Sequence, residues 1–329
     1  MNIVLDGKAL AEKIKADIAV EAKKLIKKPG LAVIVVGDNP ASDIYVRNKN
    51  KDCEDCGFYV ETYRLKHKEL KTVRKGEPHA LFPAIQYSED RTFYTPDSVD
   101  WFDLSNIINE LNDSPRIDGI LLQLPLPEAF RSYEKDLLSK IIPEKDVDGF
   151  HPINRGKMLT GEECFLPCTP AGIIALLDSY EIDCAGKRCV VIGRSNIVGK
   201  PIAMMMQQKN ATVIMCHSKT PSADLKDHLR SADIIITAAS QPGLITPDLV
   251  KEGVIIIDVS MNRDENGKLC GDCTKDTYEK ASYYTPVPGG VGPMTRAMLM
   301  KNTLIAAQNN EINKEKTLLT AVYGVNKSL

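Results

Sequence analysis

The segment VVIGRSNIVGKP, residues 190–201, holds the pattern that decides the fold of the second half of the chain. An apolar β-branched run ends at Gly193 and a helix is expected from about Gly199, which predicts a strand–turn–helix unit. Backbone amides at such a helix N-terminus can hold a pyrophosphate. Ser195 stands where the G-x-G-x-x-G pattern has its second glycine. Taken alone, this segment is therefore also compatible with an ordinary strand-to-helix turn.

Predicted strands and helices alternate on both sides of this turn, which indicates parallel α/β architecture. Short apolar runs predict strands over 31–36, 58–65, 117–124, 188–193, 211–216, 233–237 and 254–259. Helices are expected from about 43 to 56 with Ser42 as N-cap, after Thr169-Pro170, near 222–230 and from about 294 to 309. The pattern restarts near residue 150, so we expect two α/β domains, the second a Rossmann-like nucleotide-binding domain with a parallel sheet.

Composition excludes several classes of protein. Lys+Arg is 42 and Asp+Glu is 44 in 329 residues, so the net charge of −2 gives no reason to expect a nucleic acid or an anionic membrane as partner. No apolar run approaches the roughly 18–20 residues of a membrane span. The N-terminus has the pattern of neither a signal peptide nor a transit peptide. We expect the nine cysteines to be free thiols, and the two features together predict a cytoplasmic protein.

The residues after the second strand of the nucleotide-binding series indicate which cofactor is bound. NAD-binding domains usually carry Asp or Glu there for the ribose 2′-hydroxyl. Here residues 211–216 are followed by His217, Ser218 and Lys219, and the first carboxylate is Asp224. A basic, hydroxylated pocket joined by Arg194 suits a 2′-phosphate and favours NADP, with a solvated polar loop as the alternative.

Four polar residues in the first half are candidates for a catalytic site. Tyr45 and Lys49 are four residues apart on one predicted helix and therefore share a face. Gln123 lies in an apolar strand, where a buried amide must find partners, either structural or in a site. Asp148 lies in a loop rich in turn residues, where a turn or cap carboxylate is the structural alternative.

Six motifs in order join these features into one resemblance: SDIYVRNK (42–49), DGILLQLPLP (118–127), PEKDVDGFHPINRG (143–156), PCTPAGI (167–173), VVIGRSNIVGKP (190–201) and TPVPGGVGPMT (285–295). From Val4 to about Asn309 the chain resembles the bifunctional methylenetetrahydrofolate dehydrogenase/methenyltetrahydrofolate cyclohydrolase family. The resemblance implies oxidation of 5,10-methylenetetrahydrofolate with NADP, then hydrolysis of the methenyl cation to 10-formyltetrahydrofolate. It implies a place in one-carbon metabolism, including purine biosynthesis.

The resemblance also implies an architecture. We expect two α/β domains flanking a cleft that holds the active site, in a homodimer. The final helix is expected to return to the first domain. The expected domains are therefore 1–149 plus 294–329, which bind folate, and 150–293, which bind NADP.

Roles in catalysis follow from the matched positions. Lys49 matches the catalytic lysine and Gln123 the glutamine that tunes it, while Tyr45 matches a tyrosine that stacks on folate. Asp148 matches the carboxylate that reads the pterin, whose adjacent donors suit a bidentate acceptor. Burial and a nearby methenyl cation both disfavour an ammonium, so a lysine of lowered pKa can help deprotonate water.

Roles in ligand binding follow in the same way. Arg194 and Ser218 match positions that contact the 2′-phosphate of NADP. The pyrophosphate turn is formed by Gly193, Ser195, Ile197 and Gly199. The loop that borders the cleft and the substrate contains Pro288, Gly289 and Gly290. Its glycines allow close backbone approach to ligands.

Two departures from the family pattern carry expectations of their own. Ser240 and Ser260 stand where the family usually has glycine, after strands at the cofactor-facing end, and a hydroxymethyl group there is expected to crowd the nicotinamide half. The segment 66–103 reads as a long loop or flap. Its basic start, with five Lys or Arg residues within 66–75, suits the polyglutamate tail of cellular folates, with a solvated flap as the alternative.

Several other functions stay open on the sequence. Cys53-x-x-Cys56 and Cys270-x-x-Cys273 invite a zinc interpretation, but 213 residues separate the pairs, so we predict no metal. His151 and His217 are expected to be structural or to lie beside ligands. The alternatives are another NADP-dependent two-domain dehydrogenase, for example of shikimate-like substrates, a member with only the cyclohydrolase activity, and a non-catalytic folate- or nucleotide-binding protein.

Overall fold

The computed structural model describes residues 2–38, 40–66, 86–87, 92–94 and 99–323. It forms two compact units: residues 1–14 with 155–299, called the first unit here, and 15–154 with 300–329, the second unit. This division differs from the expected boundaries at both ends of the chain. Residues 1–14 join the first unit because strand β1 (Ile3–Val4) pairs in parallel with β13 (Ala281–Tyr284).

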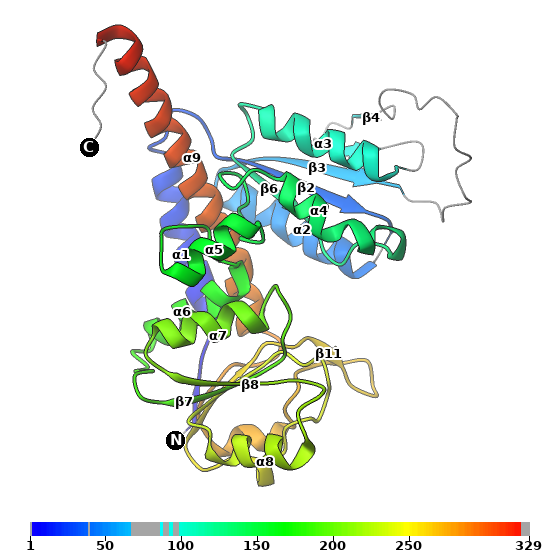
Figure 1. The fold of residues 1–329 in the computed structure, drawn as a ribbon, viewed down its shortest axis with the longest axis vertical. Helices are drawn as coiled ribbons and strands as arrows, with labels where there is room; N and C mark the ends of the chain where they lie inside the picture. The colour runs from blue at the N-terminus through cyan, green and yellow to red at the C-terminus, as the bar shows by residue number, and fades with distance from the viewer. Residues whose placement is uncertain (1, 39, 67–85, 88–91, 95–98, 324–329) are drawn as a thin grey trace. The chain divides into compact units, whose positions relative to one another are not determined.

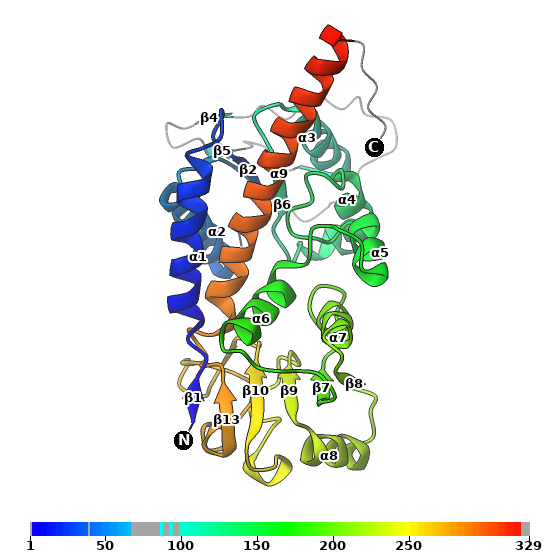
Figure 2. The same cartoon turned by 90° about the vertical axis from the view of Figure 1, so that its left-hand side faces the viewer.

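The first unit is built on a six-stranded sheet in the order β1-β13-β10-β9-β7-β8, which Figure 2 shows from one edge to the other. All of its strand pairs are parallel. The remaining strands are β7 (Arg188–Ile192), β8 (Thr212–Cys216), β9 (Ile234–Thr237) and β10 (Val254–Asp258). Helices α6 (Cys168–Ser179) and α7 (Gly199–Gln208) cover one face, and α8 (Ser222–Ser231) covers the other (Figure 1). The predicted parallel α/β sheet is confirmed.

The order of the strands locates a crevice in this sheet. The chain forms β7 first, places β8 on one side of it and then β9 on the other. In open α/β sheets, ligands bind outside the carboxyl ends of the strands at such a reversal. The reversal between β7 and β9 is where the segment 193–199 lies.

The second unit has a five-stranded sheet in the order β4-β5-β3-β2-β6. Its strands are β2 (Gly30–Val36), β3 (Tyr59–Leu65), β4 (Gln86–Tyr87), β5 (Thr92–Tyr94) and β6 (Gly119–Leu122). Only β4 runs antiparallel among the described pairs of this sheet. Helices α2 (Pro40–Asp55) and α3 (Trp101–Asp113) lie on opposite faces (Figure 1). All seven residues of β2 are buried, as the continuous apolar run predicts. The reversal here falls between β2 and β6.

The remaining elements are mostly short. They include the helices α1 (Gly7–Ala22), α4 (Glu134–Lys140) and α5 (Pro152–Thr160). Three 3₁₀ segments also occur: Glu128–Tyr133 before α4, Pro247–Leu249 between β9 and β10, and Lys275–Lys280 before β13. Strands β11 (Asn262–Arg263) and β12 (Leu269–Cys270) form an antiparallel pair. Among the described residues, no helix is both long enough and apolar enough to pass through a bilayer.

Two expectations for the second unit differ from the structure. Helix α2 begins at Pro40, so Ser42 lies within its first turn and is not its N-cap. The expected flap at 66–103 contains β4 and β5 and the N-cap of α3, Asp100, whose side chain forms a capping box with Asp103. Of that flap, 67–85, 88–91 and 95–98 lie outside the described residues.

The last helix is longer than expected. Helix α9 runs from Val291 to Tyr323, whereas the pattern predicts an end near residue 309 and a tail of weak structure. No glycine or proline occurs between Met294 and Tyr323, so nothing in the sequence ends the helix there. Residues 324–329 lie outside the described part of the chain.

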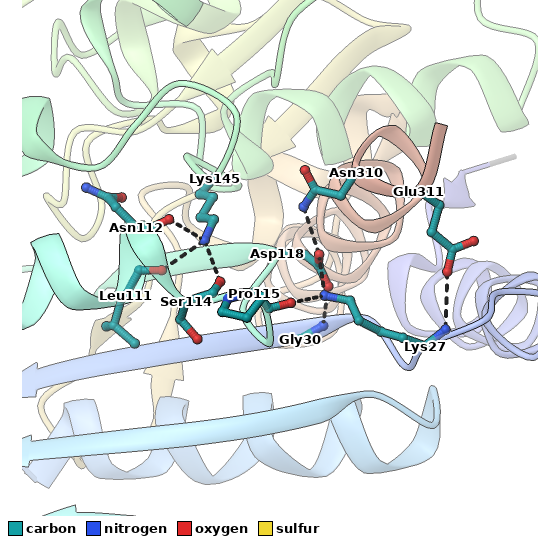
Figure 3. Close-up of polar contacts among 10 residues, drawn as sticks. All are labelled: Lys27, Gly30, Leu111, Asn112, Ser114, Pro115, Asp118, Lys145, Asn310 and Glu311. Atoms are coloured by element: carbon teal, nitrogen blue, oxygen red, sulfur yellow. Dashed lines mark hydrogen bonds and ion pairs between the residues drawn. The ribbon is translucent and has the colours of Figure 1, made fainter. Parts of the chain in front are cut away.

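A buried carboxylate anchors α9 within the second unit (Figure 3). The Asp118 side chain, which is fully buried, accepts hydrogen bonds from Lys27 Nζ, Gly30 N and Asn310 Nδ2, each at 2.8 Å. These donors come from the turn after α1, the start of β2 and the body of α9. One charge therefore joins three segments that are far apart in sequence.

Candidate active site

The turn after β7 has a backbone path that only glycine allows. Gly193 has φ 119°, and a Cβ there would lie 2.5 Å from the carbonyl oxygen of Ala238. A Cβ on Gly199 would lie 2.2 Å from the carbonyl oxygen of Gly193. The chain therefore folds back closely on itself at the reversal between β7 and β9, and leaves a cradle of bare backbone.

Ser195 explains why the second glycine of the usual pattern is absent. Its Oγ accepts hydrogen bonds from the amides of Val198 and Gly199, at 3.1 and 3.2 Å, and its carbonyl accepts from Lys200 N. The serine thereby fixes the turn that leads into α7. The amides of residues 195–197, including that of the half-buried Ile197, donate to no group that the structure describes. They are therefore available to an anion, and this fits a pyrophosphate.

Arg194 and Ser218 follow neighbouring strands. Ile192 of β7 is paired with Cys216 of β8, so each of the two residues lies two positions beyond this pair. Both are exposed. His217 between them has a structural role: its Nδ1 accepts from Lys219 N at 3.2 Å, which shapes the turn after β8. A guanidinium and a hydroxyl at adjacent strand ends suit a phosphate group.

In the second unit, Lys49 and Gln123 meet across 74 residues of sequence. Lys49 Nζ on α2 donates to Gln123 Oε1 at 2.8 Å, and Gln123 Nε2 donates to the carbonyl of Leu124 at 2.6 Å. Gln123 N also donates to the carbonyl of Ile34, so the residue extends β6 beside β2. The pair therefore lies at the carboxyl ends of the strands where the order reverses.

This hydrogen bond orients Lys49 without neutralising it. The two contacts of Gln123 fix which end of its amide faces Lys49. An amide oxygen carries no full charge, so it holds the lysine less firmly in its protonated form than a carboxylate would.

Tyr45 lies one turn before Lys49 on α2, with 37% of its side chain exposed. Partial burial raises the pKa of its phenol, so the ring stays neutral. An exposed, neutral aromatic ring one turn from the lysine is a surface on which a flat ligand can stack.

Asp148 lies in the loop 145–149 beside a second, better buried carboxylate. Asp146 accepts from the amides of Phe150 and His151 and from Asn154 Nδ2. Burial raises the pKa of Asp146 to about 6, and the charge of Asp148 adds to the effect. Asp146 therefore organises the loop, and Asp148 beside it is half-buried.

The loop with Pro288, Gly289 and Gly290 belongs to the first unit. Gly289 has φ 114° and its carbonyl accepts from Lys8 N at 3.0 Å, while a Cβ on Gly7 would lie 1.9 Å from the carbonyl oxygen of Gly290. The loop is therefore packed closely on the start of α1, with its backbone as the contact surface.

The cysteines contribute packing. All nine are free, and burial raises the pKa of the thiols of Cys53, Cys56 and Cys273. Within the described ranges, no cluster of three His, Cys, Asp or Glu side chains could hold a metal ion. His151 is also structural, since its Nδ1 accepts from Ile153 N.

Both halves of the chain match models of one protein family. Residues 5–75 and 86–148 match the tetrahydrofolate dehydrogenase/cyclohydrolase catalytic domain, and 167–311 match the NAD(P)-binding domain of the same family. The chain belongs to the tetrahydrofolate dehydrogenase/cyclohydrolase family.

Members of the tetrahydrofolate dehydrogenase/cyclohydrolase family resemble this chain along nearly its whole length. The bifunctional protein FolD of Moorella thermoacetica is 45% identical over 309 residues, 93% of this chain and 98% of that protein. The bifunctional enzyme FolD of Campylobacter jejuni is 44% identical with a TM-score of 0.82, over 94% of this chain and 99% of the other. The enzyme of Trypanosoma brucei, solved with NADP cofactor and inhibitor, is 33% identical with a TM-score of 0.81, over 94% and 98%.

Asp272, which was not among the predicted site residues, connects segments of the first unit. It is completely buried and binds the hydroxyls of Thr237 and Ser260. A carboxylate in the polar segment 271–276 gives no local sign of burial, so the only available signal was its place soon after a strand of the nucleotide-binding series.

Proposed function

We propose that this protein oxidises 5,10-methylenetetrahydrofolate with NADP and hydrolyses the resulting 5,10-methenyltetrahydrofolate to 10-formyltetrahydrofolate. The observation that carries the proposal is the contact between Lys49 and Gln123 at the strand ends of a family catalytic domain. The glycine turn of the NAD(P)-binding domain supports the oxidative half.

NADP supplies the acceptor for the hydride when it is bound. The chain holds it through the backbone of Gly193, Ser195, Ile197 and Gly199, which surrounds the pyrophosphate. Arg194 contacts the 2′-phosphate together with Ser218. The protein's task in this step is to hold the folate carbon in place, because orientation lowers the barrier.

Lys49 promotes the hydrolysis of the methenyl cation. The cation disfavours a second positive charge nearby, which lowers the pKa of the lysine while substrate is bound. A neutral amine can then accept a proton as water attacks the cationic carbon, and the bond from that carbon to N5 breaks as N5 takes up a proton, which leaves the formyl group on N10. Gln123 keeps the amine aimed at the reacting centre through the 2.8 Å contact.

Folate is recognised by its ring system. Tyr45 stacks on the ring, and the ionised Asp148 accepts from the two adjacent donors of the pterin. Pro288, Gly289 and Gly290 border the bound substrate. We assign folate binding to 1–149 with 294–329 and NADP binding to 150–293, with the first 14 residues packed in the cofactor-binding unit.

Three further properties belong to the proposal. The protein acts as a homodimer. It takes polyglutamylated folate, which the basic residues within 66–75 suit, since their charge is opposite to that of the tail. It works in the cytoplasm, in keeping with nine unpaired cysteines. Equal apparent affinity for mono- and polyglutamyl substrate, before and after deletion of 67–85, would contradict the proposed binding of the polyglutamate tail.

Parallel spectrophotometric assays test the function. NADPH formation from methylenetetrahydrofolate and decay of methenyltetrahydrofolate are followed in wild type, Lys49→Met and Lys51→Met. Lys51 is an exposed lysine of the same helix, so its variant is the matched control. We expect NADP-dependent oxidation and hydrolysis in wild type and Lys51→Met, and loss of hydrolysis by at least about 100-fold in Lys49→Met.

The other outcomes select other functions. Hydrolysis without oxidation indicates a cyclohydrolase whose nicotinamide site is altered at Ser240 and Ser260. Neither activity in the wild type indicates a binding protein. Equal hydrolysis in Lys49→Met and wild type contradicts the proposed role of the lysine.

A further inference from the structure

A buried hydrogen-bond network joins the loops at the carboxyl ends of β9 and β10. Its centre is the carboxylate of Asp272, which has no exposed surface. Five groups donate to this carboxylate: Thr237 Oγ1 at 2.6 Å, Ala239 N at 2.9 Å, Gln241 N at 2.7 Å, Ser260 Oγ at 2.7 Å and Asn262 Nδ2 at 2.9 Å. A carboxylate with this many donors is a rigid anchor for the segments that supply them.

Ser260 differs from the other four donors because its hydroxyl also accepts. Its oxygen takes a hydrogen bond from Ser240 N at 3.0 Å and gives one to Asp272 at 2.7 Å. The side chain is 5% exposed, so water offers little replacement for either contact. The hydroxyl is the bridge between the Ser240 backbone and the anchor.

Ser240 needs this bridge because its backbone is strained. Its φ is 56°, in the left-handed region that is unfavourable for a residue with a side chain and open to glycine. The amides of residues 239, 240 and 241 all point into the network, two to Asp272 and one to Ser260. Three consecutive anchored amides hold a conformation that the serine would otherwise leave.

The loop held in this way borders the cofactor turn. Ala238 N donates to the carbonyl of Ile192, and the Ala238 carbonyl is the atom that excludes a Cβ at Gly193. The loop therefore lies on the β9 side of the pyrophosphate turn, whereas Ser218 follows β8 on the other side. With the 2′-phosphate at the β8 side, the nicotinamide half of a dinucleotide extends toward β9 and β10.

We propose that Ser260 is a positioning residue for the nicotinamide half of NADP, acting through the Ser240 backbone that it ties to Asp272. The inference rests on the proposed function. For Ser260 it reverses the expectation that the serine crowds the nicotinamide, because the Ser260 hydroxyl is turned into the protein and supports the loop.

The test compares two ligands by calorimetry in wild type and Ser260→Ala. NADP has both the adenosine 2′-phosphate half and the nicotinamide half. Adenosine 2′,5′-bisphosphate has only the adenosine half, which is expected to bind near β8. We expect Ser260→Ala to weaken NADP binding about 5- to 50-fold, because an amide left without its partner loosens the loop. The affinity for the bisphosphate should change less than about twofold, and methenyltetrahydrofolate hydrolysis should be unchanged.

Thr277→Val is the matched control, since it also deletes a buried hydroxyl of the first unit. Thr277 Oγ1, in the 3₁₀ segment before β13, donates to the carbonyl of Ile245 and not to the side chain of Asp272 or to Ser240 or Ser260. The control should leave the ratio of the two affinities as in wild type. Ser240→Gly in the Ser260→Ala background should recover at least about threefold in NADP affinity, because glycine adopts positive φ without strain.

Each other result overturns the inference. Equal weakening of both ligands, or of neither, shows that Ser260 has no specific role at the nicotinamide half. No recovery in the double variant shows that Ser260 does not act through Ser240. A wild-type protein that hydrolyses methenyltetrahydrofolate but binds neither ligand removes the NADP part of the proposed function as well.

Discussion

At the scale of single residues, the pKa of a buried carboxyl depends on its burial and on its hydrogen-bond donors. Asp146 accepts three hydrogen bonds, which favour its ionised form, yet burial dominates and raises its pKa to about 6. A carboxyl whose pKa is higher in the folded chain binds a proton more tightly there. Its contribution to stability is full below about pH 3.8 and is lost as the pH rises through about 6.

The pKa of Asp146 can be measured and moved. From 3.8 to about 6, at about 1.4 kcal/mol for each pH unit, the free energy involved is about 3 kcal/mol. Asn154→Ala removes one donor to the ionised form and should raise the pKa further. Carbon-detected NMR titration of the carboxyl measures both values. A midpoint near 4 in wild type would contradict the effect of burial.

The pair of Lys49 and Gln123 allows a second test at this scale. Gln123→Glu replaces a neutral acceptor with a carboxylate 2.8 Å from the lysine, which should raise the lysine pKa. Hydrolysis of methenyltetrahydrofolate should then fall at least about tenfold at pH 7 and recover toward higher pH. The pH profile, corrected for uncatalysed hydrolysis, checks this. An unshifted profile would show that the lysine does not act as a base.

At the scale of elements, helix ends are held by buried polar groups. Lys145 Nζ donates to the carbonyls of Leu111, Asn112 and Ser114 at the end of α3, at 2.9, 2.6 and 2.8 Å (Figure 3). The carbonyls of Leu111 and Asn112 belong to the last turn of α3, where carbonyls lack partners within the helix, and a cation there also meets the negative end of the helix dipole. Burial lowers the pKa of Lys145, because it disfavours the charged ammonium. The three hydrogen bonds to carbonyls oppose this effect, because they favour the charged form.

Lys145→Met should therefore destabilise the protein by about 3 kcal/mol, since it leaves buried carbonyls without a donor. Lys135→Met, at an exposed site on the neighbouring α4, is the control and should change stability by less than about 0.5 kcal/mol. Urea unfolding followed by circular dichroism measures both. Equal stabilities of the two variants would show that the cap contributes little.

At the scale of the whole molecule, the proposed NADP turn lies in the first unit and the proposed hydrolytic residue Lys49 lies in the second, so hydrolysis should persist when oxidation is lost. Gly193→Ala puts a Cβ 2.5 Å from the Ala238 carbonyl at a positive φ, and should weaken NADP binding and oxidation at least about 100-fold. Hydrolysis, which we propose depends on Lys49, should be retained. Gly156→Ala is the control because a Cβ there meets nothing within 4 Å. Parallel loss of both activities in Gly193→Ala would contradict the separation.

The candidate residues and most strands were predictable from local patterns. The buried run of β2 and the turn at Gly193 are recognisable because strand and turn propensities act over a few residues. The motifs around Lys49, Gln123 and Asp148 were readable for the same reason. The length of α9 was also present in the sequence, as a stretch without glycine or proline.

The partners of these residues were decided only by tertiary structure. Lys49 reaches Gln123 across 74 residues, β1 joins a sheet whose other strands begin at residue 188, and Ser260 connects Ser240 to Asp272. Contacts of this kind depend on strand order and on which side chains become buried together, and these are properties of the packed core. The sequence by itself therefore determined the elements and the chemical groups, and the packing of the sheets decided which groups meet.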